Sequence, residues 1–124
     1  MKKLLIILLL LPSLAIAKDY KTIISGKKLT YKGENCAGVA FSSNGLYAFI
    51  YAEQGTKCLP NLSLRVKWLN NNTVMLVERN KTAENAPQVI VMQFKSIKKN
   101  KTTVKNIWAG WGDQPDQIEK YTIK

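Results

Sequence analysis

Apolar and polar residues alternate along most of the chain beyond residue 17, which is the pattern of β-strands with one buried face. The alternation is clearest over residues 62–68, where leucine, valine and tryptophan share one face and serine, arginine and lysine share the other. Three asparagines follow at 70–72, and asparagine tolerates the left-handed backbone of tight turns. Because residues 73–79 alternate again, the pattern predicts an antiparallel hairpin over 62–79.

A second hairpin is predicted over residues 88–109. Its first strand, 88–97, places Ile90, Met92 and Phe94 on one face, and the turn at 98–101 leads into a returning strand over 102–109. The polar stretch 81–87 ends in proline and reads as the loop that joins the two hairpins.

Shorter strands complete the prediction, with the Asn44-Gly45 pair as a strong turn signal between two of them. They cover residues 28–32, 36–41, 46–53 and 121–124. This gives about eight strands and no convincing helix, so the fold class is all-β. Closure of antiparallel strands removes exposed sheet edges. We therefore expect a small antiparallel β-barrel or strongly curved meander, with a two-sheet β-sandwich as the alternative.

Residues 1–17 have the three parts of a secretory signal peptide. Lys2 and Lys3 precede an aliphatic run over residues 4–11, and small residues at Ala15 and Ala17 suit a signal peptidase. The apolar run is too short to span a bilayer, which takes roughly 20 residues. No cysteine lies at the cut, which argues against a lipoprotein. We expect a cleaved leader and a single soluble β domain over 18–124, located in the periplasm or secreted.

The chain has two cysteines, Cys36 and Cys58. In an oxidising compartment such a pair in a small domain is most simply a disulfide. A redox or zinc pair is the alternative, but the spacing is far from Cys-x-x-Cys and the chain contains no histidine.

Lysine dominates the charged residues, and removal of Lys2 and Lys3 lowers the net charge of the chain from +11 to +9. Such a field attracts anionic partners, including lipid headgroups and acidic proteins. The basic residues are scattered along the sequence, however, which favours a general solubilising role over a dedicated anion site. We expect a protein or an anionic envelope component as partner, and no specific nucleic-acid binding.

The lack of histidine excludes Ser–His–Asp and Cys–His nucleophile systems and histidine-ligated metals. Chemistry that needs two carboxylates remains formally possible. Asp113 and Asp116, however, lie in a proline-containing loop and read as solvated turn residues. We therefore expect no catalytic residue, metal or cofactor, and no enzymatic activity.

The most unusual local sequence is the tryptophan-glycine stretch over residues 108–116. Trp111, Gly110, Gly112 and Asp113 form the candidate binding site, because glycines free the backbone and exposed indoles are frequent interface anchors. Trp108 continues the alternation of its strand, which predicts a place in the core.

A row of aromatic residues, Tyr47, Phe49 and Tyr51, lies on one face of the predicted strand 46–53. The other face carries Ala48, Ile50 and Ala52. Aromatic side chains bury more area than alanine, so we expect the row to face inward, as core or as the lining of a ligand cavity.

Three functions fit these features. The first is a non-enzymatic binding protein of the bacterial envelope, of the inhibitor or immunity type. The second is a carrier that holds a small ligand inside the barrel, although eight strands leave little room beyond side chains. The third is a carboxylate-dependent hydrolase.

The predicted layout, a small exported β-barrel with one disulfide, is similar in architecture to bacterial envelope lysozyme inhibitors. No inhibitor motif carries residues across from that family. Common lysozymes are strongly basic and would be repelled by a chain of charge +9. The resemblance is thus compatible with a partner that is an acidic, envelope-targeting toxin.

Overall fold

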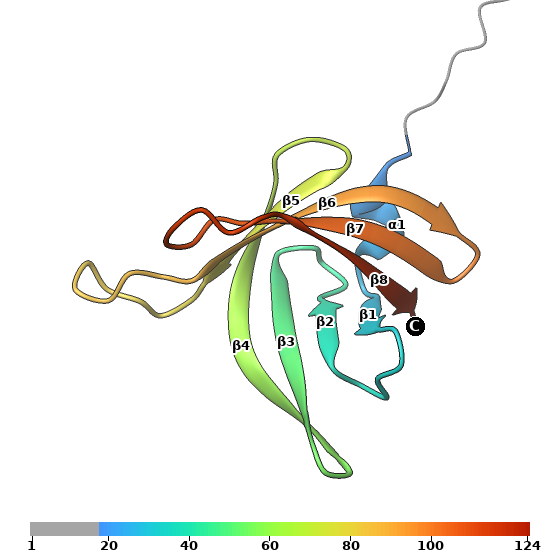
Figure 1. Cartoon of the computed structure of the whole chain (residues 1–124), viewed down its shortest axis with the longest axis horizontal. Coiled ribbons are helices and arrows are strands. Elements are labelled where there is room, and N and C mark those ends of the chain that lie inside the picture. The colour runs from blue at the N-terminus through green and yellow to red at the C-terminus, as the bar shows by residue number, and fades with distance from the viewer. Residues whose placement is uncertain (1–17) are drawn as a thin grey trace, which may run out of the picture.

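The computed structural model describes residues 18–124, so the predicted signal peptide over 1–17 lies outside the described residues. Eight strands form a closed barrel in which each strand pairs antiparallel with the next and β8 returns to β1 (Figure 1). The strands are β1 (Lys28–Tyr31), β2 (Gly38–Phe41), β3 (Tyr47–Gln54), β4 (Lys57–Trp68), β5 (Thr73–Glu78), β6 (Val89–Lys98), β7 (Lys101–Ile107) and β8 (Gln117–Ile123). This confirms the barrel and not the sandwich.

Both predicted hairpins are present. β4 pairs with β5 so that Trp68 lies opposite Val74, and β6 pairs with β7 so that Met92 lies opposite Asn106. β4 begins earlier than the alternation predicts, because a register shift in the β3–β4 pair accommodates Pro60 within the strand. Proline lacks the backbone donor of a regular ladder and is tolerated at such irregular positions. Residues 57–61 were therefore missed as strand.

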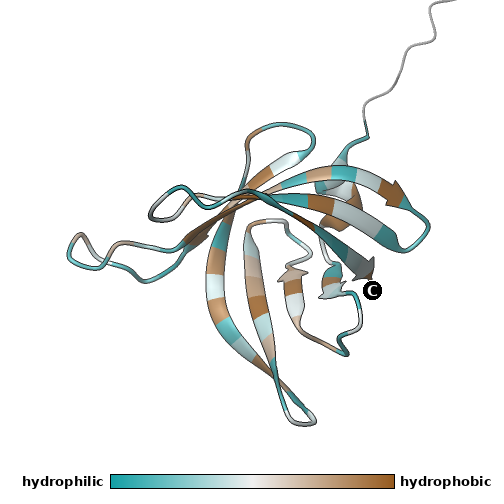
Figure 2. Ribbon diagram, in the orientation of Figure 1, coloured by the Kyte–Doolittle hydropathy of each residue, from teal (hydrophilic) through white to brown (hydrophobic). Residues whose placement is uncertain are grey.

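The barrel interior is filled by apolar side chains from every strand. Figure 2 shows the corresponding bands of hydrophobic and hydrophilic residues that alternate along β3 and β4. The fully buried members include large side chains that meet near the barrel centre, among them Leu29, Leu64, Leu76, Met92 and Phe94. Burial of such side chains stabilises a fold by about 2 kcal/mol each.

One end of the barrel is closed by a short helix that the alternation did not predict, α1 (Tyr20–Ile24). Asp19 caps it by accepting a hydrogen bond from the Thr22 backbone N–H at 3.4 Å. Tyr20 and Ile24, four residues apart, share the face that enters the barrel, and the Tyr20 ring stacks on Phe94 with centroids 5.2 Å apart. The helix thus acts as an apolar plug.

The two ends of the barrel differ in their connections. The plugged end comprises α1 and the turns at 42–46, 69–72 and 99–100. The loop end comprises the connections at 32–37, 55–56, 79–88 and 108–116. Within residues 18–124, no helix has the length and apolar character that a membrane span requires.

The predicted disulfide is present at the loop end, where Cys36 and Cys58 have Cα atoms 5.9 Å apart. Glu53 supports the same region, because its carboxylate accepts hydrogen bonds from the backbone N–H groups of Cys36 and of Ala37. The hydrogen bond from Cys36 is the main reason that the pKa of Glu53 lies below its ordinary value. The bridge therefore fixes β4 against the β1–β2 connection.

The expectation that the aromatic row faces inward is wrong. Ala48 is fully buried opposite Leu64, and Ile50 packs against the core, so Tyr47, Phe49 and Tyr51 lie on the outer face of β3. Ala48 also lies opposite the buried Phe41 on β2.

Outside the barrel, two rings of this row are covered by cations. The Arg79 guanidinium lies 4.2 Å from the centre of the Tyr47 ring, and the Lys28 ammonium lies 4.2 Å from that of Tyr51. The negative face of an aromatic ring attracts a cation that lies above it. The row is therefore a half-covered outer surface and does not line a cavity.

Candidate binding loop and groove

A groove of about 1050 Å³ lies at the loop end, between the β5–β6 connection and the β7–β8 connection. Its walls combine apolar side chains with uncharged amides. The lining residues are Glu78, Lys81, Ala86, Pro87, Gln88, Val89, Ile90, Val91, Asn106, Ile107, Trp108, Ala109, Gly110, Trp111, Gln114, Pro115 and Gln117. The two charged members neutralise each other, since Lys81 Nζ lies 2.9 Å from Glu78 Oε1. The groove therefore presents a nearly neutral surface.

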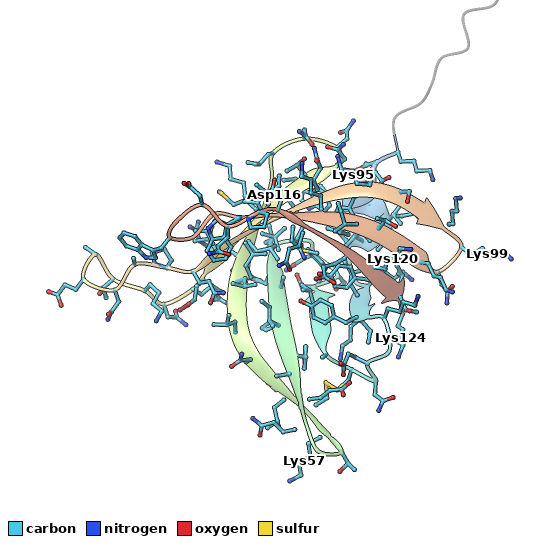
Figure 3. The ribbon with its side chains drawn as sticks, viewed as in Figure 1. Lys57, Lys95, Lys99, Asp116, Lys120 and Lys124 are labelled. Atoms are coloured by element: carbon cyan, nitrogen blue, oxygen red, sulfur yellow. A yellow bond between two sulfur atoms is a disulfide. The ribbon has the colours of Figure 1, made fainter. Side chains whose placement is uncertain are left out.

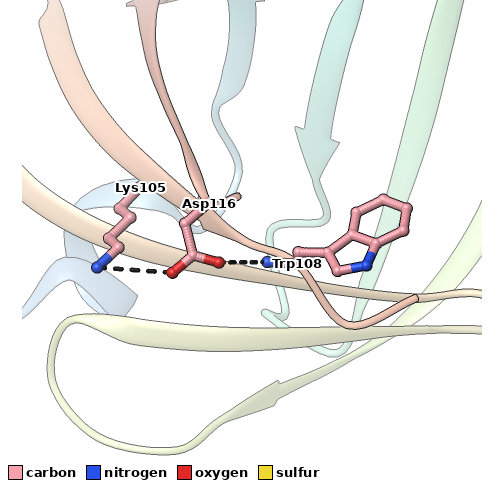
Figure 4. Close-up of polar contacts among 3 residues, drawn as sticks. All are labelled: Lys105, Trp108 and Asp116. Atoms are coloured by element: carbon pink, nitrogen blue, oxygen red, sulfur yellow. Dashed lines mark hydrogen bonds and ion pairs between the residues drawn. The ribbon is translucent and has the colours of Figure 1, made fainter. Parts of the chain in front are cut away.

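Residues 108–116, called the tryptophan loop below, form one wall of the groove. One carboxylate joins the two ends of this loop at its neck (Figure 4). Asp116 Oδ1 accepts a hydrogen bond from the Trp108 backbone N–H at 2.8 Å. Asp116 Oδ2 lies 3.6 Å from Lys105 Nζ on β7. The ion pair is exposed and contributes little by itself, but the hydrogen bond joins the two ends of the loop.

Trp108 lies in this loop and not in the core, so its predicted core position is wrong. Its side chain is 46% exposed. β7 ends at Ile107, and the Trp108 backbone N–H donates its hydrogen bond to the Asp116 carboxylate and not to a neighbouring strand. The chain then leaves the barrel before the alternation can turn the indole inward.

The Trp108 indole instead holds the loop together from within. Its Nε1–H donates to the carbonyl oxygens of Trp111 at 3.2 Å and of Gly112 at 3.1 Å. Its ring covers Gly110 so closely that a Cβ at that position would lie 2.6 Å from the ring. Residue 110 must therefore be glycine for the indole to stay in place, and Gly112 supplies the left-handed backbone of the turn, with φ of +73°.

Trp111 projects from this loop with 96% of its side chain exposed. Among the predicted site residues, Trp111 and Gly110 line the groove, whereas Gly112 and Asp113 belong to the loop but do not line it. The sequence analysis treats Asp116 as a solvated turn residue and misses its hydrogen bond to Trp108, which closes the neck of the loop. It also misses Lys105 and the amides that line the opposite side of the groove. An aspartate directly before a returning strand is the one signal that could have indicated the neck.

The groove reaches the barrel interior at Asn106, whose Nδ2 group donates to the Tyr121 hydroxyl at 3.2 Å. Burial raises the pKa of Tyr121, so this phenol is neutral at physiological pH. Asn106 and Tyr121 thus form an uncharged hydrogen-bonded pair at this point.

Among residues 18–124, the cysteine, aspartate and glutamate side chains form no group of three that could hold a metal ion. Comparison with known protein families, curated proteins and solved structures finds no match to this chain.

Proposed function

We propose that this chain is an exported, non-enzymatic binding protein of the bacterial envelope, of the inhibitor or immunity type. Its contact surface is the tryptophan loop together with the adjoining groove, and its partner is a protein. The observation that carries this proposal is the almost complete exposure of Trp111 on a loop that is fixed by its own hydrogen bonds.

An indole in water has no stabilising role in the free protein, whereas a tryptophan at the centre of an interface is often worth about 2 kcal/mol or more. The binding cost of ordering a flexible loop is reduced when the loop is already held in place. Asp116 and the Trp108 indole supply that order here. The arrangement supports a preorganised contact loop.

The barrel interior is a poorer candidate for ligand binding than the loop surface. Its centre is occupied by side chains of the core cluster, and α1 fills one end. The groove outside it is open to solvent and offers apolar surface and amide hydrogen-bonding groups side by side. That mixture resembles the composition of protein interfaces.

Export rests on the signal peptide predicted for residues 1–17, and the Cys36–Cys58 disulfide is compatible with a location outside the cytoplasm. Local charge also bears on the partner. Six of the eight acidic residues lie at the loop end: Glu34, Glu53, Glu78, Glu84, Asp113 and Asp116. The overall positive charge therefore does not describe the contact surface, and the partner need not be acidic.

Site-specific photocrosslinking in cells tests the proposal. A benzophenone amino acid is placed at position 111 in one variant and at position 67 in another, since Lys67 is exposed on the outer face of β4. We expect a crosslinked protein of one defined mass from position 111 and none from position 67. A lack of crosslinks at position 111, or the same products from both positions, contradicts the proposal.

A further inference from the structure

The plugged end of the barrel gathers lysines that are scattered in the sequence. Its exposed lysines are Lys18, Lys21, Lys27, Lys98, Lys99 and Lys101. The acidic residue at this end is Asp19, whose carboxylate is engaged by Thr22, with the hydroxyl donating at 2.8 Å. No aspartate or glutamate occurs between Glu84 and Asp113, a stretch that includes the whole β6–β7 hairpin. The positive charge is thus concentrated opposite the loop end.

Contacts hold these lysines and the neighbouring turns together. The Tyr20 backbone N–H donates to the Asn71 carbonyl in the turn at 69–72, and the Gly26 N–H donates to the Ser42 carbonyl in the turn at 42–46. Lys18 Nζ donates to the Ile97 carbonyl at 3.2 Å, which ties the start of the domain to the β6–β7 hairpin. Helix and turns therefore form one continuous surface.

Three large aliphatic side chains are exposed among these lysines. Leu46 is 57% exposed, Leu69 is 52% exposed and Ile23 on α1 is 37% exposed. Each lies on a different segment of the plugged end. Exposed aliphatic side chains between lysines are typical of surfaces that bind the interface of an anionic bilayer.

Lys99, one of these lysines, has an unusual backbone conformation. It has a φ of +56°, a backbone conformation that glycine and asparagine adopt more readily than lysine. Figure 3 shows Lys99 at the tip of the β6–β7 turn, far from Lys57 at the tip of the β3–β4 hairpin. Strained residues of this kind cluster at functional sites.

We propose that the plugged end binds the anionic phospholipid headgroups of a membrane surface. Lysine ammonium groups act as point charges that suit mobile headgroups, whereas arginine forks, absent from this set, favour fixed bidentate recognition. The exposed side chains between the lysines are aliphatic, whereas proteins that bind single-stranded nucleic acid use aromatic stacking platforms.

The bound orientation follows from the topology. β7 starts at the plugged end and finishes at the tryptophan loop, so it separates the two surfaces by the length of a seven-residue strand. At about 3.4 Å per residue this is roughly 20 Å. Trp111 would then face away from the bilayer. The membrane proposal goes beyond the proposed function and does not depend on it, because it involves the opposite end.

Sedimentation with vesicles tests the proposal on the domain 18–124. Vesicles of phosphatidylcholine alone are compared with vesicles of phosphatidylcholine mixed with phosphatidylglycerol. A triple variant, Lys98→Gln/Lys99→Gln/Lys101→Gln, removes three positive charges from the plugged end. Its matched control, Lys32→Gln/Lys57→Gln/Lys120→Gln, removes three exposed charges that lie outside the plugged end. Thermal melting confirms that both variants fold.

We expect the wild-type protein and the control to bind only the anionic vesicles, and the plugged-end triple to bind them about 100-fold more weakly. Binding should disappear when salt rises from about 0.1 M to about 1 M, because the Debye length falls from about 10 Å to about 3 Å. The double variant Leu46→Ser/Leu69→Ser should also weaken binding while leaving net charge unchanged.

Equal losses in the two triple variants overturn the proposal, because net charge alone would then explain binding. Binding to phosphatidylcholine alone, or binding that survives high salt, also overturns it. A final arm titrates duplex DNA at the same salt. Binding to DNA in the absence of any binding to vesicles would assign the lysines to a different partner and would overturn the proposal as well.

Discussion

At the plugged end, Ile24 is fully buried and Tyr20 stacks on Phe94, whereas at the loop end Trp111 projects almost entirely into solvent. Apolar packing fixes the first end. The second is fixed by hydrogen bonds, one disulfide and two glycines around an indole that stays outside the core. Ile24 is thus part of the packed core, whereas Trp111 is not. Substitutions at the two ends should therefore have different consequences.

The largest effect is expected in α1, from a pair of neighbouring isoleucines. Ile24→Ala should lower the free energy of unfolding by about 3–4 kcal/mol, because it leaves a cavity where a fully buried side chain was packed. Ile23→Ala, on the exposed side of the same helix, should stay within about 0.5 kcal/mol of the wild type. Urea denaturation measures both. Equal effects would mean that α1 is not a plug.

The disulfide should be nearly as important at the loop end. Cys36→Ser/Cys58→Ser should cost about 3 kcal/mol, because the bridge closes a loop with a sequence separation of 22 residues. The melting temperature of this variant should not respond to a reductant, whereas that of the wild type should fall. If the variant and the oxidised wild type have the same melting temperature, the bridge contributes nothing to the stability of this end.

A smaller and local effect is expected when the Trp108 indole loses its donor. Trp108→Phe keeps an aromatic ring near Gly110 but removes the hydrogen bonds to Trp111 and Gly112, at a cost of about 1 kcal/mol. Hydrogen exchange should accelerate within residues 109–115 and stay unchanged in the core strands. Faster exchange throughout the barrel would show that Trp108 supports the whole fold and not the loop alone.

The smallest effect is a pH dependence at Glu53. Its pKa is lowered in the folded state, chiefly by the hydrogen bond from the Cys36 backbone, so the contribution to stability is present above the unfolded value of about 4.5. That contribution is lost as pH falls through the lowered pKa. Glu53→Gln should therefore melt below the wild type near neutral pH, and the difference should vanish in acid. A difference that does not change with pH would contradict this role.

Much of the barrel could be predicted from the sequence because most strands bury one face. Alternation over 62–68 and 88–97 predicts which side chains enter the core, and the structure confirms these faces. It failed on residues 47–51, where both faces of the strand are apolar and alternation alone does not decide which face enters the core. A search for alternation with a period of two residues also cannot detect a five-residue helix such as α1.

The candidate site was predictable only in part. Trp111 stood out because it had no place in the alternation, but the role of Asp116 depends on a hydrogen bond across eight residues that no local pattern encodes. The same limit applies to the way charged residues are grouped on the surface. Lysines that are scattered in the sequence, such as Lys21 and Lys99, come together only when the chain folds. Contacts of this kind follow from the tertiary structure alone.

The central claim, that Trp111 provides contact and not stability, is tested most directly with Trp111→Ala. Once crosslinking has identified the partner, its affinity is measured by calorimetry for the wild type and for this variant, each with its melting curve. We expect the binding free energy to weaken by about 2 kcal/mol or more, which lowers the affinity about 30-fold, while the melting temperature stays unchanged. An unchanged affinity, or a variant that unfolds, would contradict it.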